Sequence, residues 1–270
     1  VERVGLSPLQ LVLVGTTLEI TAFLFEVPTG IVADVYSRRL SVIIGYALIG
    51  VGFLVEGLIP SFGAILVAQV LWGIGYTFTS GAHQAWITDE IGEEKVGRAF
   101  LRSSQIGSLL GIVGTVIAIA IGSAYINLPI VLGGVLHIAL ALFLVFVMPE
   151  TGFQPTPRED RSTFQQMGHT LRGGIRLVRL RPALLAILGI GFFFGLYSEG
   201  LDRLGTAHLL ESFTLPDFAG LQPVVWLRMI GIIGGLLSAG ATQIMLKRLN
   251  MDNTLALARA SSALSAVLIA

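Results

Sequence analysis

The sequence contains no cysteine, and its charged residues are few. Without cysteine, the chain can form no disulfide, no thiolate nucleophile and no cysteine-based zinc site. Only 13% of the residues are charged, about half of the ~25% found in soluble domains, whereas 54% are hydrophobic. A formal net charge of +0 gives no reason to expect a nucleic-acid partner. The composition therefore favours a protein that is surrounded by lipid.

Sequence signatures of enzymes are missing as well. The chain has no HExxH zinc motif, no GxSxG nucleophile motif and no Gly-Lys-Ser phosphate-binding loop. An intramembrane enzyme is therefore a weak hypothesis. We expect no enzymatic activity, no metal and no cofactor.

The apolar residues form runs that are long enough to cross a bilayer. A membrane core of ~30 Å needs about 20 mostly apolar residues in a helix. Seven stretches reach this length, and an eighth begins near Leu255 and stops at Ala270. The seven are roughly Leu9–Val32, Leu40–Leu58, Phe62–Ile87, Leu101–Gly122, Leu128–Met148, Ala183–His208 and Pro223–Leu246. They predict an all-α, polytopic transmembrane helix bundle.

The basic residues lie mainly in alternate connections between these stretches. Thirteen of the 17 Lys and Arg residues follow the first, third, fifth and seventh stretch, and the other connections contain none. Basic connections stay on the cytoplasmic side of a membrane. The rule predicts a multi-pass protein of the plasma (inner) membrane with cytoplasmic segments 34–39, 88–100, 149–182 and 247–252. Val1 then lies outside, so we expect one more helix before it in the complete protein.

The connection 149–182 is the longest and is the predicted linker between two halves, 1–148 and 183–270. Ser162 and Gln165 within it fit a helix capping box. An apolar stripe follows at helical spacing, formed by Phe164, Met167, Leu171, Ile175 and Val178, with Arg172, Arg176 and Arg179 beside it. Such an amphipathic helix is expected to lie among the headgroups of the inner leaflet. A solvated helix between the halves is the alternative.

A motif at the end of the first stretch resembles the signature loop of the major facilitator superfamily. The family pattern is Gly, three residues, Asp, three residues and two basic residues. The matching positions are Gly30, Ala33, Asp34, Arg38 and Arg39. Val35 and Ser37 depart from the usual residues. In the family this loop joins the second and third helices, so the resemblance implies that the chain covers about helices two to nine of twelve, in two pseudo-repeated halves.

The resemblance also implies a function. Members of the family are secondary active transporters, so we expect alternating access and, for this chain, export (efflux) of small organic molecules, with proton coupling as an option. Two departures count against a standard proton antiporter. Gln69 stands where many members have Arg, and the run Gly107, Gly111 and Gly114 lacks the proline of the family's antiporter motif. A weaker repeat supports two related halves. At an offset of 210 residues, Gly240 corresponds to Gly30 and Arg248 to Arg38.

Ionisable residues inside the predicted spans are candidates for ion coupling, because a charge at the bilayer centre is costly and needs a partner or a cavity. Glu19 and Glu26 lie near one face of the first stretch; packing against a neighbouring helix is the other interpretation. The second half supplies the remaining candidates, which are Glu199, Asp202, Arg203 and Arg228. For these, an ion pair at the outer headgroups or simple snorkelling is the alternative.

A polar and aromatic stripe runs along one side of the third stretch, and we predict that it forms the wall of a substrate cavity. It consists of Trp72, Tyr76, Thr79, His83 and Trp86, and Tyr197 of the second half is expected nearby. Aliphatic residues would be the cheaper choice on a lipid-facing surface, and in the family this helix lines the central cavity. A stripe that only packs against neighbours is the alternative interpretation.

Small residues mark expected helix crossings, because they let two backbones approach closely. One stripe consists of Ser104, Ser108, Gly111 and Thr115, and the other of Gly231, Gly235, Ser238 and Thr242. The resemblance implies that these two helices face each other across the halves. The expected partners of the complete protein are the lipid bilayer, a small-molecule substrate and protons, and it is expected to be a monomer. A membrane receptor or regulatory protein that uses the same helices without transport is the rival hypothesis.

Overall fold

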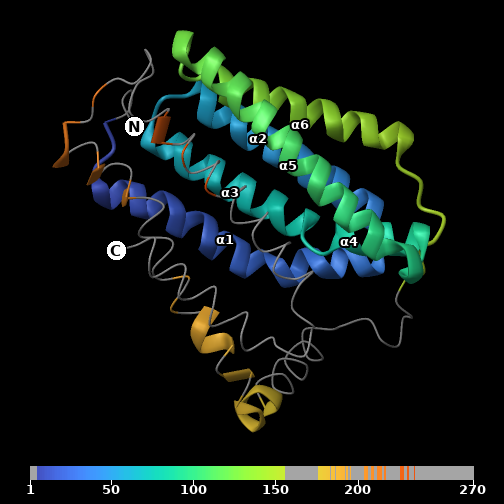
Figure 1. Cartoon of the computed structure of the whole chain (residues 1–270). Coiled ribbons are helices and arrows are strands. Elements are labelled where there is room, and N and C mark those ends of the chain that lie inside the picture. The colour runs from blue at the N-terminus through green and yellow to red at the C-terminus, as the bar shows by residue number, and fades with distance from the viewer. Residues whose placement is uncertain are drawn as a thin grey trace. The chain divides into compact units, whose positions relative to one another are not determined.

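The computed structural model describes residues 5–155 without a gap and, beyond them, only single residues and short groups between 176 and 234. Residues 5–155 are helical throughout apart from short connections (Figure 1). The helices are α1 (Pro8–Val35), α2 (Arg38–Leu58), α3 (Phe62–Thr79), α4 (Ala82–Ile91), α5 (Glu93–Ala124) and α6 (Leu128–Val147). The described part thus has the all-α architecture that the sequence predicts.

Five segments of the described part are long and apolar enough to cross a membrane. They are Pro8–Val35, Arg38–Leu58, Phe62–Ile91, Glu93–Gly122 and Leu128–Val147. These segments coincide with the first five predicted stretches, so the prediction of a polytopic helix bundle is confirmed. The later stretches and the amphipathic helix of the linker lie wholly or partly outside the described residues. The division into two halves at 149–182 therefore stays a prediction.

Serine begins three of these helices, for a local chemical reason. The first backbone N–H groups of a helix lack partners within it, and a serine hydroxyl just before the helix accepts from one of them. Ser7 accepts from the Gln10 amide at 3.3 Å, and the Gln10 side chain accepts from the Ser7 amide at 2.9 Å. Ser37 and Ser61 cap α2 and α3 in the same way. These caps set where the connections between helices end.

Helix α2 lies at the centre of the described bundle, between α3 and α6, and α1 packs on the other side of α3 (Figure 1). Facing glycines form both of the central crossings. A Cβ atom on Gly45 would lie 2.7 Å from the carbonyl oxygen of Gly75 on α3. One on Gly50 would lie 2.8 Å from the carbonyl oxygen of Gly134 on α6. Because any side chain would force the backbones apart, glycine at these positions permits the close packing of α2.

The third span differs from its prediction in one respect. The sequence suggests a single helix over Phe62–Ile87, but the structure divides it at Ser80 and Gly81 into α3 and α4. Gly81 has φ +71°, a left-handed conformation that glycine adopts without strain. The Ser41 hydroxyl donates to the carbonyl oxygen of Phe78 at 2.9 Å, next to the break. A hydroxyl from α2 thus compensates for a hydrogen bond that the interrupted helix cannot make.

Helix α5 is the least covered of the described helices. Among the described residues, its apolar window has no buried member, and a Cβ on Gly107, Gly111 or Gly114 would meet no described atom within 4 Å. The expected partner of this face, around Gly231 and Gly235, lies outside the part of the chain that the structure describes. The predicted crossing of these two helices therefore stays a prediction.

Candidate functional site

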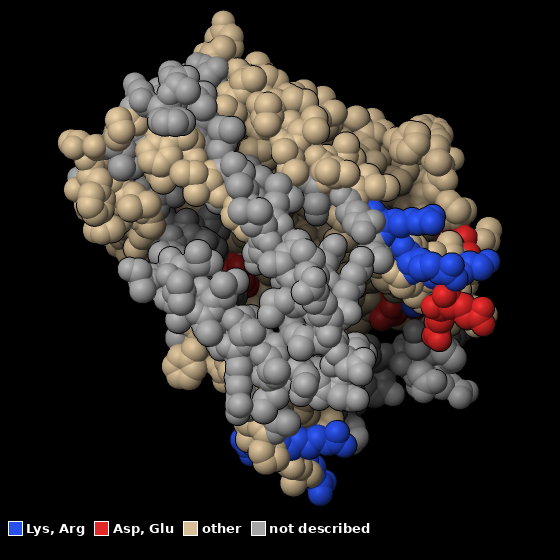
Figure 2. All heavy atoms as spheres, in the orientation of Figure 1, with Lys and Arg blue, Asp and Glu red and all other residues tan. Residues whose placement is uncertain are grey.

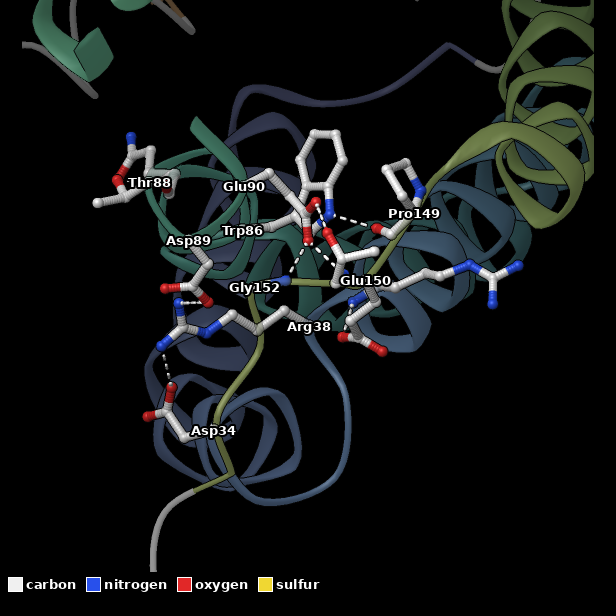
Figure 3. Close-up of polar contacts among 12 residues, drawn as sticks. Asp34, Arg38, Trp86, Thr88, Asp89, Glu90, Pro149, Glu150 and Gly152 are labelled. Atoms are coloured by element: carbon white, nitrogen blue, oxygen red, sulfur yellow. Dashed lines mark hydrogen bonds and ion pairs between the residues drawn. The ribbon is translucent and has the colours of Figure 1, made fainter. Parts of the chain in front are cut away.

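Four segments meet at one end of the described bundle, which we call the signature-loop end. They are the end of α1 at Asp34, the start of α2 at Ser37–Arg39, the end of α4 at Trp86–Glu90, and residues 149–153, which follow α6 (Figure 3). Charged side chains gather at this end of the bundle in Figure 2. It holds the matching residues of the sequence motif.

Arg38 is the central cation of this end. Its guanidinium forms an ion pair with Asp89 of α4, and a second nitrogen lies 3.9 Å from the Asp34 carboxylate (Figure 3). The Arg38 and Asp89 side chains are only 19% and 23% exposed, whereas Asp34 is 60% exposed. The guanidinium also lies 5.7 Å above the centre of the Phe153 ring. Since partial burial strengthens a charge pair, Asp89 is the main partner of Arg38 and Asp34 the minor one.

Glu150 and Arg39 connect α2 with the end of α6 in both directions. The Glu150 carboxylate accepts from the Ser37 hydroxyl at 2.7 Å and from the Arg39 backbone amide at 2.9 Å. It therefore places a negative charge at the N-terminus of α2, where the helix dipole favours one. The Arg39 guanidinium donates to the carbonyl oxygen of Val145 in the last turn of α6. Glu150, just after α6, thus places a negative charge at the N-terminus of α2, and Arg39 of α2 places a positive charge at the C-terminus of α6.

Glu90 binds the segment after α6 to α4. Its carboxylate accepts from the Thr151 amide at 2.6 Å, from the Thr151 hydroxyl at 2.7 Å and from the Gly152 amide at 2.9 Å. The Trp86 indole N–H donates to the Pro149 carbonyl oxygen at 2.7 Å (Figure 3). A Cβ atom on Gly152 would lie 2.1 Å from the carbonyl oxygen of Asp89. Glycine is therefore required at position 152 for this contact.

The sequence motif identifies only part of this arrangement. It predicts Gly30, Asp34, Arg38 and Arg39, and the structure places the last three in the network, while no described atom lies within 4 Å of a Cβ built on Gly30. Sequence reasoning missed Asp89, Glu90, Glu150 and Gly152. Their one signal is that they lie at the start of the predicted connections 88–100 and 149–182. Their partners are 51 to 113 residues away in the chain, so only the fold shows the pairing.

A second polar region lies between α1 and the break in the third span. The Glu26 carboxylate on α1 accepts from the Ser80 hydroxyl at 3.0 Å. Tyr76, one turn earlier, is 52% exposed, and His83 is exposed and stacks on Trp86 with ring centres 6.4 Å apart. We call Glu26, Tyr76, Ser80 and His83 the polar face.

The predicted aromatic stripe is thus divided by its neighbours. Trp72 packs against Phe53 of α2 with ring centres 5.5 Å apart, and a Cβ on Gly45 would lie 2.5 Å from the Thr79 methyl carbon. Trp72 and Thr79 therefore contact α2, whereas Tyr76 and His83 are exposed. Whether the stripe lines a substrate cavity stays a prediction.

The other candidate residues either lack a partner among the described residues or lie outside the described part of the chain. Glu19 is exposed on α1 and makes no hydrogen bond or ion pair with the described residues. Tyr197, Glu199, Asp202, Arg203 and Arg228 lie outside the described residues. In the part of the chain that is described, no three His, Asp or Glu side chains come together as metal ligands.

Comparison with known proteins places the chain in a family. The model of the Major Facilitator Superfamily matches residues 1–270. The chain is similar to the uncharacterized MFS-type transporter YxaM of Bacillus subtilis (strain 168), with 23% identity over 195 residues, which are 72% of this chain and 49% of that protein. The chain thus spans about half the length of the curated relative that it matches. No solved structure matches it. Because the family model covers the whole chain and the described helices form an all-α membrane bundle, the chain belongs to the Major Facilitator Superfamily.

Proposed function

We propose that this chain is part of a secondary active transporter of the plasma membrane that exports small organic molecules by alternating access. In this proposal residues 1–148 and 183–270 belong to two halves that rock against each other, and 149–182 connects them on the cytoplasmic side. The complete protein acts as a monomer in the bilayer. Membership of the family supports transport as the activity.

The observation that carries the proposal is the signature-loop end. An alternating-access protein whose two halves rock against each other needs the helices of each half to move as one unit and to stay joined to the linker. Here α4 and residues 149–153 are joined to the loop between α1 and α2 through ion pairs and charge-assisted hydrogen bonds. Such bonds are directional, so they fix the positions of the segments that they join. The signature-loop end thus holds the helices of the first half and the start of the linker together.

The polar face supplies the second requirement, which is a surface for the substrate. Tyr76 and His83 offer aromatic rings, which give contact area without a strict orientation, and Glu26 and Ser80 offer hydrogen bonds. Lipid would favour aliphatic side chains here. We therefore assign the polar face to the wall of the central cavity, with Tyr197 and the charges of the second half opposite it.

Transport by the complete protein in liposomes tests this proposal. A panel of small organic molecules would be assayed with and without a pH gradient, and empty liposomes and the Gly152→Leu variant would be the controls. We expect at least one compound class to move in the wild type and to move much more slowly in the variant. A correctly inserted protein that binds compounds but moves none would favour the receptor hypothesis.

A further inference from the structure

Among the described residues of α3, Gln69 alone has a buried side-chain polar atom without a hydrogen-bond partner. Its side chain is 3% exposed and faces α2. The amide nitrogen donates to the Glu56 carboxylate on α2 at 3.3 Å. The amide oxygen, Oε1, is buried and accepts no hydrogen bond from any described residue. Since a buried acceptor without a donor is unfavourable, this oxygen calls for an explanation.

The packing of α2 fixes Glu56 beside Gln69. One turn before Glu56, a Cβ on Gly52 would lie 3.0 Å from the carbonyl oxygen of Ala68, the residue that precedes Gln69. One residue after Glu56, Gly57 packs against Val131 of α6, and its carbonyl oxygen accepts from the Asn127 side chain at 3.0 Å. The backbone on both sides of Glu56 is therefore held, and its carboxyl group stays within reach of the amide.

The pair lies away from the signature-loop end. Glu56 is two residues from the last residue of α2, and Gln69 is about 10 Å along α3 from Phe62 at ~1.5 Å per residue. Both residues belong to spans that are long and apolar enough for a membrane. The signature-loop end does not include either of them.

The hydrogen-bonding chemistry of the two groups indicates what is missing. An ionised carboxylate only accepts, so it can satisfy the amide N–H groups and leaves the amide oxygen bare. A protonated carboxyl group has one O–H donor. An acid and a primary amide then form two hydrogen bonds, in which the acid O–H donates to the amide oxygen and the amide N–H donates to the acid carbonyl.

We propose that Glu56 and Gln69 form a proton-binding site. The Glu56 carboxylate takes up one proton from water and forms a neutral acid that donates to Gln69 Oε1, and no other bond changes. Protonation satisfies the buried oxygen and also removes a charge from a membrane span, where charge is costly. A metal ion fits less well, because hard cations such as calcium need six to eight oxygen ligands and no metal-binding group occurs among the described residues.

The role of this site in transport rests on the proposed function, whereas proton binding by Glu56 does not. A transporter that exchanges a proton for its substrate needs a group that titrates inside the membrane. With arginine at position 69, a permanent positive charge next to Glu56 would hold the carboxylate ionised. Glutamine carries no charge, so the carboxyl group can gain and lose its proton. The absence of a charge at position 69 thus favours proton uptake by Glu56.

Infrared spectroscopy of the complete protein in liposomes tests the site directly. Difference spectra between wild type and Glu56→Gln, taken across a pH titration, isolate the C=O stretch of a protonated Glu56. We expect this acid band in the wild type, and its loss in both Glu56→Gln and Gln69→Arg. Glu94→Gln, which removes an exposed carboxylate at the start of α5, is the matched control and should leave the band unchanged. Absence of any acid band that depends on Glu56 would overturn the proposal.

Transport assays on the same variants test the role of the site. In Glu56→Gln, uptake driven by a pH gradient should fall about tenfold, corresponding to ~1.4 kcal/mol of lost coupling, while exchange of substrate without a gradient persists. A response to a sodium gradient in place of the pH gradient, abolished by Glu56→Gln, would contradict proton binding. If the wild type moves no compound at all, the proposed function fails, yet the infrared band still decides whether Glu56 carries a proton.

Discussion

The signature-loop end and the polar face differ in how completely their charges are partnered. At the signature-loop end, Arg38, Arg39, Glu90 and Glu150 all bond to other elements of the same described bundle. On the polar face, Glu26 is exposed, and its carboxylate has a single hydroxyl donor among the described residues. The described bonds of the first region join elements of this half to one another and to the start of the linker. The second is arranged to meet something else, which we propose is the substrate and the other half.

The largest effect should come from Gly152. Replacing it with Leu places a side chain where a Cβ alone would lie 2.1 Å from the Asp89 carbonyl oxygen, so residues 149–153 must leave α4. All three hydrogen bonds to Glu90 would be lost with them. We expect a cost of about 3 kcal/mol, within the range for forced overpacking, and transport lowered about a hundredfold. Transport rate and thermal unfolding in detergent measure this effect.

A Gly97→Leu variant is the matched control for Gly152. Gly97 is a glycine near the start of α5, and a Cβ there would meet no atom within 4 Å. This variant should transport almost normally. Equal losses in both variants would show that the close contact at Gly152 is not responsible.

The Arg38–Asp89 pair should give the next largest effect. Arg38→Gln leaves the partly buried Asp89 without its cation, at a cost of about 2 kcal/mol, which lowers the population of the intact signature-loop end about thirtyfold. The double variant Arg38→Gln with Asp89→Asn should recover much of this loss, because it removes the unpaired charge. A double-mutant cycle on transport rates measures the coupling, and strictly additive losses would argue against the pair.

Asp34 should give a smaller effect, although it is the central acidic residue of the sequence motif. Its carboxylate is 60% exposed and 3.9 Å from the guanidinium, a geometry that contributes about 0–1 kcal/mol. Asp34→Asn should therefore slow transport about fivefold at most, with membrane insertion unchanged. A loss larger than that of Arg38→Gln would mean that Asp34 has a stronger partner than Arg38.

The fold was the more predictable part of the molecule. Long apolar stretches and alternate basic connections depend on local sequence, so the first five spans could be placed from them. The break at Gly81 could not, because a glycine inside an apolar stretch is equally consistent with a continuous helix. The Ser41 hydroxyl of α2, which bonds to the Phe78 carbonyl oxygen next to the break, comes close to it only in the folded bundle.

The candidate site was only half predictable for a similar reason. The motif contains Asp34, Arg38 and Arg39 within a few residues, so the sequence reveals them together. Asp89 and Glu150 are distant in the chain, and each looks like an ordinary charge beside a span until the helices pack. The same is true of Gln69, whose buried oxygen becomes informative only when Glu56 is seen beside it.

Thiol labelling of the polar face in the complete protein tests most directly whether this face is open to water and substrate. The chain has no cysteine, so single cysteines can be placed at positions 76 and 72 without background from residues 1–270. We expect a small water-soluble reagent to label Tyr76→Cys and substrate to protect it. Trp72→Cys, which replaces a side chain packed against Phe53, should label far more slowly. An inert position 76 beside a reactive position 72 would contradict the assignment of the polar face to the transport pathway.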